Sequence, residues 1–64
     1  IIIKRVLRFG SRGDDVKELQ KLLGINADGI FGNLTMDKVM NFQKENGLFV
    51  DGIVGPKTLL KLIK

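Results

Sequence analysis

The chain has 64 residues, a length that fits one small domain, and it contains no Cys and no His. Disulfides and the usual zinc ligand sets are therefore excluded, and apolar packing must stabilise the fold. The formal net charge is +4, and the first twelve residues hold no acidic side chain but four basic ones: Lys4, Arg5, Arg8 and Arg12. Such an edge can face nucleic acid, an anionic membrane or an acidic polymer, and it can equally be a solvated linker.

The N-terminal stretch starts with three isoleucines, Ile1 to Ile3, and is too short for a signal peptide or a membrane span. The β-branched residues up to Leu7 are typical of an extended strand or of a linker remnant. Since the numbering starts without Met, we expect the chain to be a module of a longer protein. We predict a linker or extended N-terminal remnant over residues 1–5 and one domain over residues 6–64.

The first helix is predicted after the turn at residues 10–13. We expect Asp14 or Asp15 to cap it, because a carboxylate there can accept a hydrogen bond from a free backbone N–H. Gly24 is placed to end it. Between these limits the apolar residues follow the i, i+3, i+6, i+7 spacing of one buried stripe: Val16, Leu19, Leu22 and Leu23.

Two further helices are predicted in the second half of the chain. One opens near Asn33 and ends at Asn46-Gly47, a pair suited to a left-handed C-terminal residue. The other begins at Pro56, whose fixed φ and missing N–H suit the first helical position. Their apolar residues are Met36, Val39, Met40 and Phe42 in the former and Leu59, Leu60, Leu62 and Ile63 in the latter.

A repeat links these elements, because residues 28–35 (DGIFGNLT) return 23 positions later as residues 51–58 (DGIVGPKT). The register also pairs Gln20 with Gln43 before the loops. A short helix followed by an Asp-Gly turn cannot bury its apolar face alone, so the two copies must pack on each other. We therefore predict an all-α fold of three helices built on a tandem repeat.

The loop residues are interpreted mainly as scaffold. In each Asp-Gly turn, Asp accepts local hydrogen bonds and Gly supplies positive φ, while a second Gly marks the next helix entrance. Ile30 and Ile53 are expected to point inward as anchors. Gln20 and Gln43 are placed to tie a helix to a loop backbone. The predicted structural loop motif comprises Asp28, Gly29, Gly32, Thr35, Asp51, Gly52, Gly55 and Thr58.

The composition contains few of the residue types that usually carry out catalysis. His, Cys, Tyr and Trp are absent, and Ser11 is the only serine. Asp28 and Asp51 have identical loop contexts, whereas a hydrolytic acid and base need environments that separate their pKa values. An EF-hand calcium loop needs several alternating oxygen ligands, and the turn at Asp28-Gly29-Ile30 has only the first of them. We therefore expect no enzyme activity in this chain, no catalytic residue, no metal and no cofactor.

From Gly10 to Leu62 the chain reads, in order, GSxGxDVxxLQxxL, DGIFGxxT, VxxFQxxxGL and DGIVGPKTxxxL. This ordered series of motifs resembles the peptidoglycan-binding-like domain of bacterial and phage cell-wall hydrolases, over about residues 6–64. The resemblance implies a compact, noncatalytic three-helix module, acting as a monomer. It would bind the glycan strands and stem peptides of peptidoglycan and tether an attached amidase, peptidase, muramidase, endolysin or autolysin. The setting would be the cell wall or the secreted, extracellular space.

Four residues are predicted to touch such a ligand. Arg12 can pair bidentately with a stem-peptide carboxylate. Gln43 and Asn46 can hydrogen-bond peptide or acetamido groups, and Phe49 can stack on a sugar ring. Phe31, inside the first loop, is expected to be buried.

Two other functions are compatible with the sequence. A nucleic-acid-binding module would use the basic N-terminal edge, although neither nucleic acid nor membrane is the expected partner. Similar modules also serve as propeptide domains in extracellular metalloproteases, where a cysteine switch follows the domain. This chain has no Cys, which weakens that second alternative.

Overall fold

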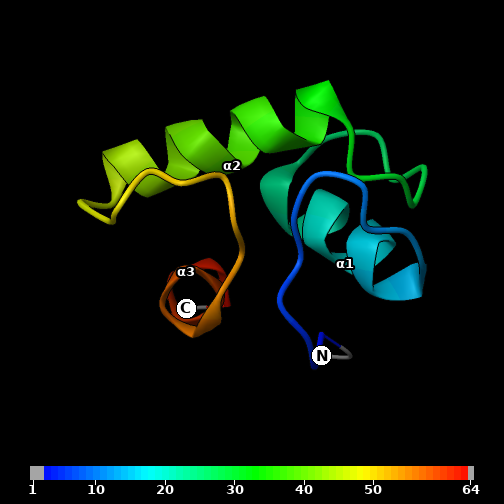
Figure 1. Cartoon of the computed structure of the whole chain (residues 1–64), viewed down its shortest axis with the longest axis horizontal. Helices are drawn as coiled ribbons and strands as arrows, with labels where there is room; N and C mark the ends of the chain where they lie inside the picture. The colour runs from blue at the N-terminus through cyan, green and yellow to red at the C-terminus, as the bar shows by residue number, and fades with distance from the viewer. Residues whose placement is uncertain (1–2, 64) are drawn as a thin grey trace.

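The computed structural model describes residues 3–63 and contains three helices: α1 (Asp14–Leu23), α2 (Asn33–Glu45) and α3 (Pro56–Leu62). Figure 1 shows α2 along one side of the molecule and α1 and α3 on the other, with the N-terminal segment passing between them. Within residues 3–63 the extended segments form isolated β-bridges and no strand. The predicted all-α class with three helices is confirmed.

The start of α1 differs from the sequence-based expectation. Gly13 is the N-cap residue, and neither Asp14 nor Asp15 provides a side-chain cap. The carboxylate of Asp15 binds Arg5, with Nε to Oδ2 at 2.6 Å and Nη2 to Oδ1 at 3.1 Å. Its Oδ1 also accepts a hydrogen bond from the backbone N–H of Val16 at 2.9 Å, so Asp15 bonds to a first-turn N–H from inside the helix. The cap prediction was wrong in position, because α1 begins at Asp14 and its N-cap residue, Gly13, has no side chain.

The other helix limits agree with the predictions. Gly24 ends α1 in the left-handed conformation, with φ 75°. Asn46 is the C-cap of α2, and Gly47 follows it with φ 68°. Pro56 is the first residue of α3. Local residue chemistry therefore determines where these helices begin and end.

The core gathers residues from the helices, the two loops and the N-terminal segment. Leu7 pairs with Val54 in both directions, with N to O distances of 3.2 and 2.7 Å. Ile3 is buried as well, so the described part of the N-terminal stretch packs against the helices. The exact start of the domain stays a prediction. The buried apolar residues are Ile3, Leu7, Val16, Leu19, Phe31, Val39 and Val54.

The inward anchor of the first loop is Phe31 and not Ile30. Ile30 is 45% exposed, whereas Phe31 is 1% exposed. The backbone of Phe31 pairs with the N-terminal segment, donating to Ser11 O at 2.9 Å and accepting from Gly10 N at 2.8 Å. Since side chains alternate along extended backbone, this pairing turns Ile30 outward. The prediction for Ile30 was wrong, and the expectation that Phe31 is buried is confirmed.

The loop glycines fall into two groups. Gly29 and Gly52 have φ of 79° and 73°, as the Asp-Gly turns predict. A Cβ on Gly52 would also lie 3.2 Å from Cγ of Met36. Gly32 and Gly55 are extended, and a Cβ on either would meet nothing within 4 Å. Only the first glycine of each loop is therefore required by the backbone.

Candidate functional site

The first loop is tied to α1 by the side-chain amide of Gln20, which is buried. Its Oε1 accepts a hydrogen bond from the backbone N–H of Gly29 at 2.9 Å. Its two N–H groups are shared among three acceptors. These are Asp28 Oδ1 at 2.9 Å, the carbonyl oxygen of Ile30 at 3.0 Å and Thr35 Oγ1 at 2.9 Å. One side chain thus joins α1, the loop and α2.

Gln43 holds the second loop through a matching set of bonds. Its Oε1 accepts from the backbone N–H groups of Asp51 at 3.1 Å and Gly52 at 3.0 Å. Its Nε2 lies 2.9 Å from Asp51 Oδ1, 3.0 Å from the carbonyl oxygen of Ile53 and 3.1 Å from Thr58 Oγ1. The scaffold role predicted for the loop Gln, Asp and Thr residues agrees with these contacts.

The two loop carboxylates have equivalent surroundings. In each, the backbone N–H two residues on donates to Oδ1, and this bond is the main cause that lowers the pKa of Asp28 and of Asp51 below its usual value of 3.8. The glutamine amide lowers each pKa further. Both groups are anionic at neutral pH. Since the two pKa values shift in the same direction, these residues do not form an acid and base pair for hydrolysis.

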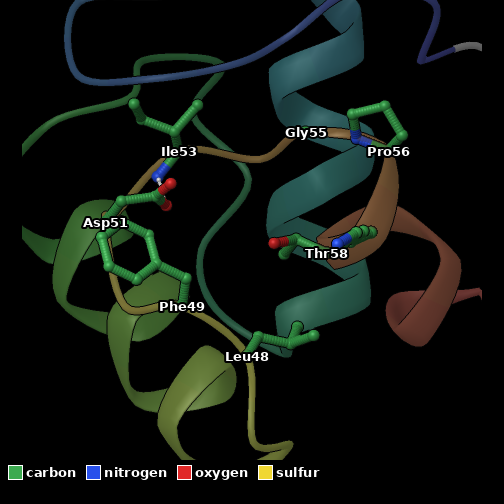
Figure 2. A pocket seen from close by; sticks show the side chains of 8 residues that line it. Leu48, Phe49, Asp51, Ile53, Gly55, Pro56 and Thr58 are labelled. Atoms are coloured by element: carbon green, nitrogen blue, oxygen red, sulfur yellow. Dashed lines mark hydrogen bonds between the residues drawn. The ribbon is translucent and has the colours of Figure 1, made fainter.

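A groove of about 370 Å³ lies beside the second loop. Figure 2 shows Phe49 and Asp51 on one side of it and Pro56 and Thr58 on the other. Most of its lining is apolar, which suits a ligand with an apolar face, and a few polar groups are available for orientation. The groove is lined by Leu48, Phe49, Asp51, Ile53, Gly55, Pro56, Lys57 and Thr58.

Phe49 is the most prominent apolar side chain at this groove. It is 84% exposed, so its ring is accessible for stacking. Asn46 lies nearby in sequence as the C-cap of α2, where its Nδ2 donates to the carbonyl oxygen of Phe42 at 2.9 Å. Asn46 therefore serves the helix end and does not line the groove. Of the four predicted ligand residues, the groove contains Phe49 alone.

Arg12 and Gln43 lie elsewhere. Gln43 is 1% exposed, and both ends of its amide are used within the protein, so in this structure it offers no atom to a ligand. Arg12 is exposed and bridges to Ile30, next to the start of α2. Phe49 follows the other end of that helix, which has 13 residues and is therefore about 20 Å long. The structure does not bring Arg12 and Phe49 together.

Sequence reasoning gave a ligand role to none of the other seven lining residues. Asp51, Gly55 and Thr58 were placed in the scaffold motif and Ile53 was taken as a loop anchor, while Leu48, Pro56 and Lys57 were given no role in the site. A signal was present in the repeat. The positions equivalent to Phe49 and Lys57 in the first copy hold Asn26 and Leu34. The difference between the copies therefore points to these two groove residues, whereas the lining positions Asp51, Ile53, Gly55 and Thr58 are identical in the first copy and could not be found in this way.

Within residues 3–63 no group of three or more His, Cys, Asp or Glu side chains is placed to hold a metal ion. None of the helices in that part of the chain combines the length and the apolar character of a membrane span.

A family model for a peptidoglycan binding domain matches residues 12–62. Among solved structures, the SleB N-terminal domain is similar with a TM-score of 0.93 and 38% identity, over 98% of this chain and 94% of that one. A fused Zn-dependent amidase/peptidase/peptidoglycan-binding domain-containing protein from Clostridium acetobutylicum ATCC 824 has a TM-score of 0.91 at 36% identity. A Burkholderia AP3 phage endolysin has a TM-score of 0.88 at 46% identity.

The coverage differs among these structures. The match includes 97% of this chain but 30% of the Clostridium protein, and 91% of this chain but 24% of the endolysin. The chain therefore spans almost all of one similar structure and less than a third of the other two. In those two proteins the matching region is one part of a larger chain.

Proposed function

Because the chain belongs to the peptidoglycan binding domain family, we propose that it binds murein without cleaving it and targets an attached cell-wall hydrolase to its substrate. The observation that carries the proposal is the groove beside the second loop, where an exposed aromatic ring stands over an apolar floor. Sugars have apolar faces and stem peptides have apolar side chains, and both suit such a floor. The loop carboxylates serve the scaffold instead of catalysis.

Targeting follows from simple mass action. A module that holds its partner on an insoluble polymer raises the effective concentration of the partner at each bond to be cleaved. The gain requires only moderate affinity of the module for the polymer. The larger chains of the similar amidase/peptidase and endolysin support this arrangement. We place the bound module at the cell wall.

The first test is cosedimentation with insoluble, teichoic-acid-free peptidoglycan at low and high salt. Chitin and double-stranded DNA are the control polymers. We expect retention on murein that persists at high salt, because stacking and hydrogen bonds are less salt-sensitive than phosphate contacts. Failure to pellet with murein at either salt concentration would contradict the proposal.

A pair of variants connects this assay to the groove. Phe49→Ser removes the exposed ring, and Leu60→Ser is its control because Leu60 is 58% exposed but does not line the groove. We expect Phe49→Ser to weaken murein binding about fivefold to tenfold, consistent with about 1 kcal/mol of aromatic contact. Neither variant should change the melting temperature. Equal binding by both variants would remove Phe49 from the site.

The nucleic-acid alternative receives less support from the geometry. Arg5, part of the basic N-terminal edge, is paired with Asp15 and also donates to the carbonyl oxygen of Arg12 at 2.6 Å. One of the four positive charges is therefore already compensated within the protein. Steeply salt-dependent retention on DNA, without retention on murein, is the result that would favour the alternative.

A further inference from the structure

Two opposite charges line the groove without neutralising each other. Asp51 and Lys57 are both exposed lining residues. Among residues 3–63 neither takes part in an ion pair, since the pair found there joins Arg5 to Asp15. Asp51 uses Oδ1 for its bonds to Gln43 and Ile53, which leaves Oδ2 to solvent. The groove thus presents one free anionic oxygen and one free cation to the same ligand.

A third polar group in the groove has an unused hydrogen-bond donor. The side chain of Thr58 is 5% exposed, and its Oγ1 accepts from Gln43 Nε2 at 3.1 Å. The hydroxyl donates to no acceptor found among residues 3–63. Thr35 Oγ1 has the matching single bond at 2.9 Å in the first loop, but only Thr58 lines the groove. A carbonyl oxygen of a bound ligand can accept from the Thr58 hydroxyl. A ligand that carries a carbonyl as well as both charges would use all three polar groups.

These groups discriminate between the two parts of murein. The sugars carry acetamido and hydroxyl groups, and bound sugar would leave both Asp51 and Lys57 without partners of opposite charge. The stem peptide carries carbonyls, carboxylates and the side-chain amine of a diamino acid. That amine is charged in an un-cross-linked stem and becomes a neutral amide when a cross-link acylates it.

Building on the proposed murein-binding function, we propose that the groove binds un-cross-linked stem peptides, with the free amine on Asp51, a carboxylate on Lys57 and a peptide carbonyl on the hydroxyl of Thr58. Phe49 and the apolar floor then contact the aliphatic parts of the stem. Acylation of the amine removes the charge that Asp51 binds and adds bulk to it. The module therefore prefers lightly cross-linked wall, and it directs an attached hydrolase there.

The first loop supplies a control within the same molecule. Asp28 has the same bonds to a glutamine amide and to the backbone N–H two residues on, but it does not line the groove. Leu34 stands at the position equivalent to Lys57 and carries no charge. Asp51→Asn and Asp28→Asn therefore alter equivalent scaffold positions, and only the former alters the groove. Asn keeps a side-chain carbonyl oxygen as acceptor in both variants.

The experiment compares three soluble probes by NMR titration of the isotope-labelled chain. They are N-acetyl-L-Ala-γ-D-Glu-L-Lys-D-Ala, the same peptide with a second acetyl group on the lysine side-chain amine, and fully N-acetylated chitotetraose. The N-terminal acetyl group replaces the amide bond to the sugar, so the lysine amine is the one free amine among the three probes. We expect the free peptide to shift the amide signals of Gly52, Ile53 and Thr58, and acetylation to weaken its binding about fivefold, as for one exposed charge pair. Asp51→Asn should bind both peptides equally, while Asp28→Asn should retain the preference.

The outcomes separate this inference from the proposed function. Equal affinity of the parent chain for the two peptides, or groove shifts caused by chitotetraose and by neither peptide, would overturn the inference. If the chain then still pelleted with murein, the proposed function would stand and the groove would recognise sugar. Loss of cosedimentation with murein would contradict the proposed function itself. The peptide comparison uses the unaltered chain, so it does not depend on the folding of any variant.

Discussion

Replacement of Gln43 by Leu should strongly destabilise this domain, although the two side chains have similar size. The Gln43 amide satisfies the backbone N–H of Gly52, which is buried, and the hydroxyl of Thr58, which is 5% exposed. Leu cannot bond to either group, and water has little access to them. The substitution therefore leaves at least two buried polar groups unsatisfied.

The magnitude follows from these two groups. Each unsatisfied buried group costs about 1–3 kcal/mol, and burial of the added apolar surface of Leu returns about 1–2 kcal/mol. A net loss of about 3 kcal/mol is expected. A 64-residue domain has a free energy of unfolding of about 3–10 kcal/mol. At about 4–8 °C for each kcal/mol, the melting temperature should fall by about 10–25 °C.

Circular dichroism melts and urea titrations of three variants provide the assay. Gln20→Leu should cost about as much as Gln43→Leu, because the amide of Gln20 has matching partners in the first loop. Asn41→Ala, at an exposed position of α2, is the control and should leave stability nearly unchanged. A Gln43→Leu melting temperature within about 4 °C of the parent, equivalent to 1 kcal/mol or less, would refute the conclusion that this amide holds the loop.

Three further predictions concern the loops and the N-terminal segment. Gly52→Ala should lower the free energy of unfolding, measured by urea titration, by about 1–2 kcal/mol, because the φ of Gly52 is 73°. Gly32→Ala, at an extended backbone, should lower it by under about 0.5 kcal/mol. Equal losses would contradict the conclusion that the backbone requires glycine at position 52 and not at position 32. The pKa values of Asp28 and Asp51 are lowered in the folded chain, so the unfolded chain binds more protons in acid. The stabilisation of the folded chain by these two ionised carboxylates is therefore complete above about pH 4 and is lost as pH falls through the folded pKa values. Acid titration should show a weaker pH dependence of stability in the Asp28→Asn, Asp51→Asn double variant, and an unchanged dependence would argue against this linkage. Arg5→Ala should lower stability only slightly, and less at high salt, because the Arg5 side chain of this ion pair is half exposed; a loss independent of salt would show that the apolar stem of Arg5 is what matters.

The shared repeat motif allowed much of the fold to be predicted. The glycines that end α1 and follow α2, the proline that starts α3 and the Asp-Gly turns act through the backbone of their own neighbours. The two equivalent glutamines could be assigned to the scaffold because their positions recur with the loops. The candidate site was harder to predict, since Phe49 was identified while Lys57 and Thr58 were not expected to touch ligand.

The errors share one physical origin. Ile30 was expected to point inward, but the N-terminal segment pairs with Phe31 and so decides which side of the loop is buried. Asp15 was expected to be the helix cap, but Gly13 is the N-cap residue, and the carboxylate of Asp15 binds Arg5 from ten residues away as well as the N–H of Val16. Both outcomes depend on which distant segments meet, and that is decided by packing of the whole chain.

The sequence by itself determined the ends of α1 and α2, the start of α3 and the positive-φ turns, because these depend on short-range hydrogen bonding and backbone sterics. It also placed Gln20 and the loop Asp and Thr residues in the scaffold, but it assigned Gln43 to the ligand as well. Only the tertiary structure decided that Arg12 lies far from Phe49 and that Asp51, Lys57 and Thr58 line one groove. A groove is formed by side chains brought together from a helix and a loop, and its shape follows from core packing that no local pattern encodes.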